Sequence, residues 1–172
     1  MMLRDVLAVA VLAGVAGAVC AQSYPARVVR VIVAYPPGGS IDVVTRLVNQ
    51  RLTAVLGQQF IAENRAGAAG NIGTDYVAKA APDGYTLLMG SAASISSAPA
   101  VYAKLPYDPV RDLAPIVQVA NQPNVLTAHP SVPARTLKEF IALAKANPGK
   151  FNYGSSGIGA SQHMTAELFA ML

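Results

Sequence analysis

The sequence predicts an α/β fold with a largely parallel sheet, and three observations carry that prediction. Short runs of β-branched residues alternate with longer segments of helical periodicity. Glycine- and proline-rich turns separate the two kinds of segment. The alternation begins near residue 28 and continues to the last residue. Strands that alternate with helices are typical of domains in which helices cover a mostly parallel sheet.

The first unit is a strand, a glycine turn and a helix. Residues 28–35 (VVRVIVAY) form a β-branched run that predicts a buried strand, ended by residues 36–39 (PPGG). Ser40 is placed to cap a helix that runs to about Leu56, and Gly57 closes it. Apolar residues at helical spacing predict the face that packs on the sheet: Val44, Leu47, Val48, Leu52, Val55 and Leu56.

The pattern then repeats along the chain. Residues 59–64 predict a second strand, and a glycine-rich turn at 67–73 leads into a helix that ends near Ala80. Residues 85–89 predict a third strand after a Pro-Asp-Gly turn. A proline-bearing loop follows. The remaining predicted strands are residues 114–120, 124–128 and 151–153, and the remaining helices are one capped by Thr136 and ending near Ala146 and one that starts at Ser161.

The N-terminus has the layout of a secretory signal peptide. Arg4 gives a short positive start, an uncharged apolar run covers residues 6–21, and Val19-Cys20-Ala21 offers a cleavage site. A membrane-spanning helix would need about 20 apolar residues, more than this run provides. Cys20 also raises the possibility of a lipoprotein. Cleavage after Ala21 would remove the only cysteine, so we expect no disulfide and no thiol nucleophile in the exported protein.

Composition narrows the possible ligands. Charged residues make up 13% of the chain, the formal net charge is +4, and there is no block of Lys and Arg, so we expect no nucleic-acid binding. Two histidines and scattered acids offer no metal-ligand spacing, and we expect no metal and no cofactor. The mild positive balance is compatible with an anionic small ligand.

Two glycine-rich loops, each followed by a helix, are the candidate binding elements. The first is residues 36–40 (PPGGS) and the second is residues 154–159 (GSSGIG). Glycine lets the backbone approach a ligand closely, and the free N–H groups and dipole of a helix start attract an anion. Two such loops suggest two jaws that close on one ligand. Both could equally be ordinary β–α turns.

Three enzymatic interpretations of the second loop lack essential residues. Residues 154–161 approach a phosphate-binding P-loop, but Ala160 occupies the position of its lysine. Tyr153 stands where a short-chain dehydrogenase needs glycine. A hydrolase that uses Ser155 or Ser156 with His163 would lack a nucleophile elbow and an orienting acid. We therefore expect that the protein is not an enzyme. The alternative hypothesis is a secreted α/β serine hydrolase.

The order of motifs resembles the Bug receptors, the substrate-binding proteins of tripartite tricarboxylate transporters. The segments that carry the resemblance are residues 24–25 (YP), 31–42 (VIVAYPPGGSID), 63–73 (ENRAGAAGNIG), 78–89 (AKAAPDGYTLLM), 105–115 (LPYDPVRDLAP), 129–131 (HPS) and 153–169 (YGSSGIGASQHMTAELF). They cover nearly the whole exported chain in order. Ser97-Ala98-Pro99 departs from the Ser-Asn-Pro of many members.

The resemblance implies a two-domain periplasmic-binding-protein fold of type II with a ligand cleft between the domains. It implies a signal peptide at residues 1–21, a first α/β domain at 22–122 and the start of a second at 123–172. Family members are longer, and the chain stops inside a predicted amphipathic helix, so we expect a truncated chain or fragment.

The resemblance also implies the ligand, the partners and the site. The ligand would be a small carboxylate (a di- or tricarboxylate, an acidic amino acid or an aromatic acid), captured in the periplasm by a monomer and delivered to transporter membrane subunits. The residues implied to bind it are Pro37, Gly38, Gly39, Ser40 and Asp42 in the first jaw, Ser91 in the cleft wall, and Gly154, Ser155, Gly157, Gly159, Ser161 and His163 in the second jaw.

Overall fold

The computed structural model describes residues 23–171, and the predicted signal peptide lies outside that range. Its centre is a three-stranded parallel sheet in the order β2-β1-β3, as the sequence predicts. The strands are β1 (Val29–Val33), β2 (Phe60–Asn64) and β3 (Thr86–Met89). The register places Val31 of β1 between Ala62 and Leu87.

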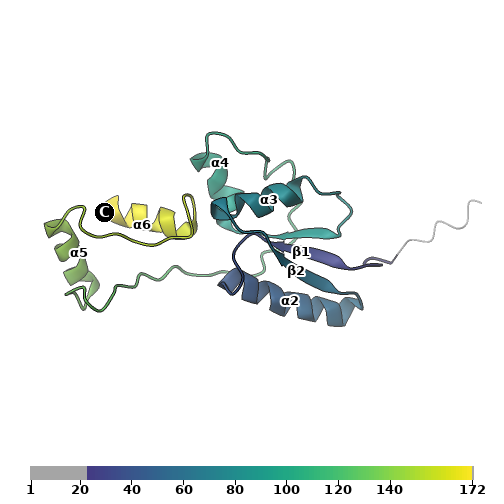
Figure 1. Cartoon of the computed structure of the whole chain (residues 1–172), viewed down its shortest axis with the longest axis horizontal. Helices are drawn as coiled ribbons and strands as arrows, with labels where there is room; N and C mark the ends of the chain where they lie inside the picture. The colour runs from purple at the N-terminus through teal and green to yellow at the C-terminus, as the bar shows by residue number, and fades with distance from the viewer. Residues whose placement is uncertain (1–22, 172) are drawn as a thin grey trace, which may run out of the picture.

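Two helices cover the sheet on opposite sides, α2 (Ser40–Leu56) and α3 (Asn71–Ala78) (Figure 1). β1 is the most buried strand, because it has a strand on each side and a helix on each face. Val29, Ile32 and Val33 have no exposed surface at all. This pattern explains why the central run of the sequence is continuously β-branched rather than alternating.

The predicted apolar face of α2 is only partly correct. Its fully buried positions are polar: Asp42, Thr45 and Asn49. Leu47 and Val55 are instead 62% and 63% exposed, and Leu56 is exposed too. The sheet beneath α2 is only three strands wide, so the helix buries a narrow stripe, and the glycine turn before it directs Asp42 inward. Val44, Val48 and Leu52 are partly buried beside that stripe.

Short helical turns connect the sheet to the second half of the chain. They are η1 (Ala68–Gly70), the π-helical η2 (Ala93–Ser97) and α4 (Ala98–Val101), of which η2 and α4 were not predicted. The proline-bearing loop after them is fixed by Tyr107, whose single hydroxyl proton is shared between two acceptors, Ser94 O at 2.6 Å and Asn71 Oδ1 at 2.8 Å from the hydroxyl oxygen. Burial raises the pKa of Tyr107 to about 12, so the hydroxyl stays a donor.

The strand predictions for residues 114–120, 124–128 and 151–153 are wrong for this structure. All three segments are extended but unpaired. Ile116 and Val125 are each 78% exposed. A β-branched pattern indicates a strand only where a neighbouring strand receives its hydrogen bonds, and the described sheet contains only β1, β2 and β3.

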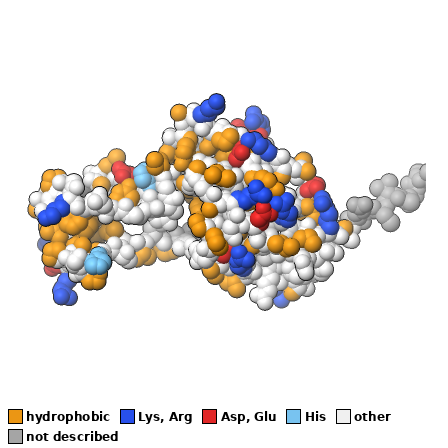
Figure 2. All heavy atoms as spheres, viewed as in Figure 1, with side chains coloured by type: hydrophobic (Ala, Val, Ile, Leu, Met, Phe, Trp, Pro, Cys, Tyr) orange, Lys and Arg blue, Asp and Glu red, His pale blue; other side chains and the backbone are white. Residues whose placement is uncertain are grey.

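The C-terminal part holds two helices, α5 (Leu137–Ala146) and α6 (Ser161–Met171), as predicted. Thr136 and Glu139 form a capping box at the start of α5. Phe140 of α5 packs against Phe151 and Phe169, with ring centroids 5.7 and 6.3 Å away, and so ties α5 to the segment that follows it and to α6. Figure 1 shows this part beside the sheet, at the end of the long extended stretch that follows α4, and Figure 2 shows it as a smaller lobe beside a larger one.

No helix within residues 23–171 has the length and apolar character needed to cross a bilayer.

Candidate functional site

The first glycine loop leaves the carboxyl end of β1 and enters α2. Gly38 has a φ of 82°, a left-handed conformation that favours glycine. The helix cap is Gly39 rather than Ser40, and no side chain caps the helix. Ser40 is the first helical residue, and its exposed hydroxyl donates to Gln122 Oε1 at 2.8 Å. The first turn of α2 therefore keeps backbone N–H groups that have no intrahelical partner.

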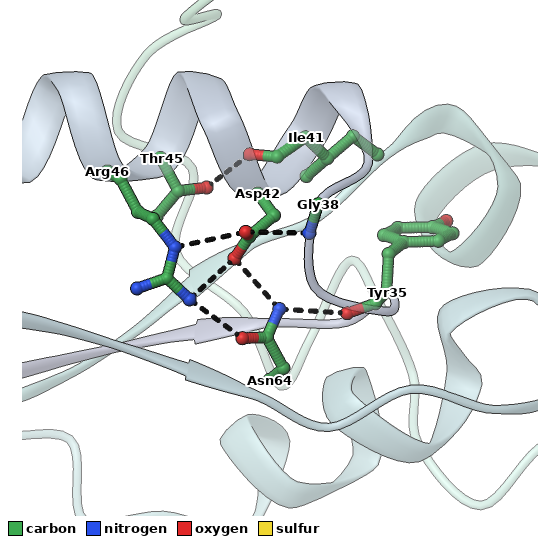
Figure 3. A network of polar contacts seen from close by, with 7 residues as sticks. All are labelled: Tyr35, Gly38, Ile41, Asp42, Thr45, Arg46 and Asn64. Atoms are coloured by element: carbon green, nitrogen blue, oxygen red, sulfur yellow. Dashed lines mark hydrogen bonds and ion pairs between the residues drawn. The ribbon is translucent and has the colours of Figure 1, made fainter.

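Asp42 fixes this loop from beneath, as Figure 3 shows. Its carboxylate accepts from Gly38 N at 3.0 Å, from Arg46 Nε at 3.0 Å and from Asn64 Nδ2 at 2.9 Å. Asn64 also donates to Tyr35 O at 3.1 Å, so one network joins the end of β2 to both ends of the loop. Asp42 is 3% exposed. Its oxygens face protein donors, so Asp42 shapes the loop from within.

The same contacts keep Asp42 ionised. The hydrogen bond from Arg46, followed by those from Gly38 N–H and Asn64, holds the pKa of the carboxyl well below its usual range. Arg46 balances the negative charge next to α2's N-terminus. The loop is therefore held by an acid without presenting a net negative group to an incoming anion.

The second glycine loop enters α6 in a similar way. Gly157 and Gly159 have φ values of 122° and 83°. Gly159 N donates to His163 Nδ1 at 3.4 Å. Ser161 begins the helix, and its hydroxyl lies 3.4 Å from Asn124 Oδ1. Gly154 and Ser155 lie in the exposed approach to the loop.

The second loop packs against the part of the chain that follows the sheet. Ala160 is 1% exposed and forms a small buried cluster with Ala69 and Ala93. Tyr102 donates its hydroxyl proton to Ile158 O at 3.0 Å. A Cβ on Gly157 would lie 3.6 Å from Ala69 N, which is ordinary contact. These contacts bring a loop from the end of the chain next to η1 and η2.

Tyr35, which directly precedes the first loop, and Ser91 hydrogen-bond to each other next to the residues that contact the second loop. The hydroxyl of Tyr35 donates to Ala69 O at 3.0 Å and hydrogen-bonds Ser91 Oγ. Burial raises the pKa of Tyr35. Ala69 in turn contacts the second loop, so these residues connect the two loops by a short chain of contacts. Ser91 was predicted from the sequence. Tyr35 was not.

The structure does not assemble a hydrolase from the second loop. Ser156 Oγ donates to Gln162 Oε1 at 3.0 Å, and Ser155 Oγ accepts from Gly157 N at 3.3 Å. His163 Nδ1 is taken by Gly159 N, so neither serine hydrogen-bonds to it. Within residues 23–171, no group of three or more His, Cys, Asp or Glu side chains is arranged to hold a metal ion.

Two surface pockets lie away from the glycine loops. One of about 480 Å³ is lined by Arg65, Ile72, Asp75, Tyr76, Lys79 and Ala80 on the outer side of α3. Another of about 380 Å³ lies between α2 and β2. Neither includes a residue that the sequence implicates. The candidate site is therefore the pair of glycine loops together with Tyr35 and Ser91.

Comparison with known proteins points to one family. Residues 44–172 match the model of the tripartite tricarboxylate transporter family receptor. Protein BugT of Bordetella pertussis is 42% identical over 164 residues, which are 92% of this chain and 49% of that protein. The chain thus spans about half the length of the curated relatives it matches.

Solved structures agree with this match. A Rhodopseudomonas palustris protein solved with adipate is 36% identical, with a TM-score of 0.82 over 85% of this chain and 49% of that one. MatC from the same organism, solved with bound malate, is 32% identical, with a TM-score of 0.80 over 86% of this chain and 50% of that one. The matched family is one of receptors rather than enzymes, and the fold is that of periplasmic binding proteins, of which this chain covers a part. On the match over residues 44–172, the chain belongs to the tripartite tricarboxylate transporter receptor family.

Proposed function

We propose that this chain captures a small carboxylate between its two glycine loops, in the periplasm, for delivery to the membrane subunits of a tripartite tricarboxylate transporter. The observation that carries the proposal is the convergence of two glycine loops with helix starts on one region around Tyr35 and Ser91. The ligand class is a di- or tricarboxylate, an acidic amino acid or an aromatic acid. Adipate and malate, bound by two similar proteins, support that class.

The ligand contacts would come mainly from backbone. The N–H groups at the starts of α2 and α6 are the donors that suit a carboxylate. Pro37, Gly38, Gly39 and Ser40 supply the first jaw. Gly157, Gly159 and Ser161 supply the second, with Gly154 and Ser155 at its approach and Ser91 in the wall. Asp42 and His163 belong to the site through the loops that they hold.

Residues 22–122 and 123–172 are proposed to belong to two domains. Capture would close these domains about the extended stretch near Gln122, without covalent chemistry. The hydrogen bond between Ser40 and Gln122 lies at that boundary. The receptor is proposed to act as a monomer, with residues 1–21 as its export signal.

Calorimetric titration tests the proposal. The chain from Gln22 onward is titrated with malate, with adipate and with uncharged succinamide. Saturable binding of at least one acid, and none of succinamide, is expected. If neither malate nor adipate gives a binding heat, and circular dichroism shows that the chain is folded, the proposal is contradicted.

A matched pair of variants separates a local effect from a change in net charge. Ser40→Glu places a negative charge at the first loop, and Gln50→Glu places the same charge on the exposed side of α2. Ser40→Glu is expected to weaken malate binding about tenfold or more through repulsion, and Gln50→Glu less than about twofold, because solvent screens its more distant charge. Equal losses would show that the anion does not bind at the first loop.

A further inference from the structure

The two glycine loops share one backbone design. Gly38 and Gly159 stand two residues before their helices and have φ values of 82° and 83°. The next residue closes the first helical turn in both cases. Gly39 O accepts from Val43 N at 3.0 Å, and Ala160 O accepts from Met164 N at 2.9 Å. A serine then begins each helix.

The correspondence extends to the side chain that holds each loop. In the first loop, Gly38 N donates to Asp42 Oδ2 at 3.0 Å. In the second, Gly159 N donates to His163 Nδ1 at 3.4 Å. Both acceptors stand four residues after the glycine, in the first turn of the helix. In both loops, the N–H of a glycine with positive φ is thus satisfied by a side-chain acceptor from the first turn of the following helix.

We propose that His163 is a positioning residue whose unprotonated Nδ1 fixes the second loop through Gly159, as Asp42 fixes the first through Gly38, and that protonation of the ring releases this hold. The consequence for ligand capture rests on the proposed function; the hold on Gly159 does not. His163 does not need to touch the ligand for this role.

The chemistry of the two acceptors makes the jaws unequal. A carboxylate held ionised by Arg46 accepts from Gly38 at every pH at which the fold is ordinarily studied. An imidazole accepts through Nδ1 only while that nitrogen is unprotonated, which places the ring proton on Nε2. Histidine is the side-chain type whose charge changes between about pH 5 and 8. Of the two acceptors, only the imidazole can lose its acceptor nitrogen to a proton while the other remains an ionised carboxylate.

Two titratable groups face the ring. Tyr153 approaches it with ring centroids 6.4 Å apart. Glu167, one turn further along α6, accepts from Tyr153 OH at 2.6 Å. The Glu167 carboxylate is thus engaged by the Tyr153 hydroxyl, and the Tyr153 ring lies between that contact and the imidazole.

The test is nuclear magnetic resonance of the ligand-free chain with two variants. His163→Asn keeps an acceptor oxygen near the position of Nδ1 and cannot titrate, and His163→Phe keeps a ring without an acceptor. In the wild type, the Gly159 amide resonance is expected to move in one step together with the His163 ring signals as the pH is lowered. In His163→Asn it is expected to stay flat and protected from exchange, and in His163→Phe to exchange about tenfold faster.

Amide signals of Val31 and Gly38 serve as controls for the fold and for the first loop. They are expected to stay unchanged in all three proteins. A Gly159 amide that does not respond while the His163 ring titrates would overturn the proposal, and so would equally fast exchange in His163→Asn and His163→Phe.

The link to capture is measured separately with malate. From about pH 8 to about pH 5.5, wild-type affinity is expected to fall about threefold more than that of His163→Asn, because a released loop must be reordered on binding. Equal pH profiles would overturn the link. No malate binding by either protein would contradict the proposed function, while the Gly159 resonance still decides the hold itself.

Discussion

The carboxylate of Asp42 holds the first glycine loop, and its oxygens accept hydrogen bonds from protein donors. It accepts from Gly38 N, Arg46 and Asn64, and the last of these also reaches Tyr35 O. One side chain therefore ties together the end of β1, the end of β2 and the start of α2. Its value to an anion site is indirect, because it fixes the N–H groups and has its own charge balanced by Arg46.

Replacing Asp42 with alanine is expected to lower the melting temperature clearly, since Gly38 N–H and Asn64 lose a shared acceptor. Lys79→Ala is the control, because it breaks an exposed ion pair of the same spacing, with Asp75. Such pairs contribute less than about 0.5 kcal/mol. Thermal unfolding followed by circular dichroism compares the two, and equal changes would show that the network under the loop is not special.

The lowered pKa of Asp42 makes the free energy of unfolding depend on pH in the acid range. Because the folded-state pKa lies below the ordinary one, about 3.9, the contribution of Asp42 is complete above that value and is lost as the pH falls toward the lowered pKa. Asp42→Asn is expected to be less stable near neutrality and to lose less stability in acid than the wild type. Denaturant titrations at several pH values measure this, and parallel curves would contradict it.

At the scale of elements, α3 approaches β1 closely at Gly73. A Cβ there would lie 2.8 Å from Ala34 Cα and 2.9 Å from Arg65 O, both closer than real contacts. Gly73→Ala is expected to destabilise the fold by about 1–3 kcal/mol through overpacking. Gly154→Ala, where a Cβ meets nothing within 4 Å, is expected to be nearly neutral. Urea unfolding of both variants measures the difference, and similar midpoints would contradict this packing.

The docking of the second loop depends on Ala160. Its side chain is buried against Ala69 and Ala93, so Ala160→Leu is expected to push the loop away from η1 and η2. Hydrogen exchange of residues 157–163 should then accelerate while β1 stays protected. Ala170→Leu, at an exposed position on α6, the helix that follows Ala160, is the control. Unchanged exchange in Ala160→Leu would show that the loop is held elsewhere.

The sequence could predict the parts of these elements that local chemistry determines. The strand, glycine turn and helix of the first unit follow from composition and spacing, whereas the sequence placed Asp42 among the ligand-binding residues and the structure shows that it fixes the loop. Tyr35 could not be assigned in this way, because its partners Ala69 and Ser91 depend on how η1 and β3 are placed around β1. Residues 114–128 show the converse, since their β-branched pattern finds no strand to pair with in the described sheet.

At the scale of the whole molecule, the two loops lie far apart in the sequence and meet through residues that neither loop contains. Ala69 accepts from Tyr35, which precedes the first loop, and packs on Ala160, which belongs to the second. Both loops also end in helix starts, so their N–H groups suit the same kind of charge. This arrangement is the reason why we propose a single anion, shared by both loops, as the ligand.

The most direct test of this central claim is amide chemical-shift mapping of the chain during a malate titration. We expect saturable shifts in residues 38–41 and in residues 157–162 that fit one common dissociation constant, because one ligand contacts both loops. Shifts confined to one loop, two different dissociation constants, or shifts centred on the pocket between Arg65 and Lys79 would contradict it.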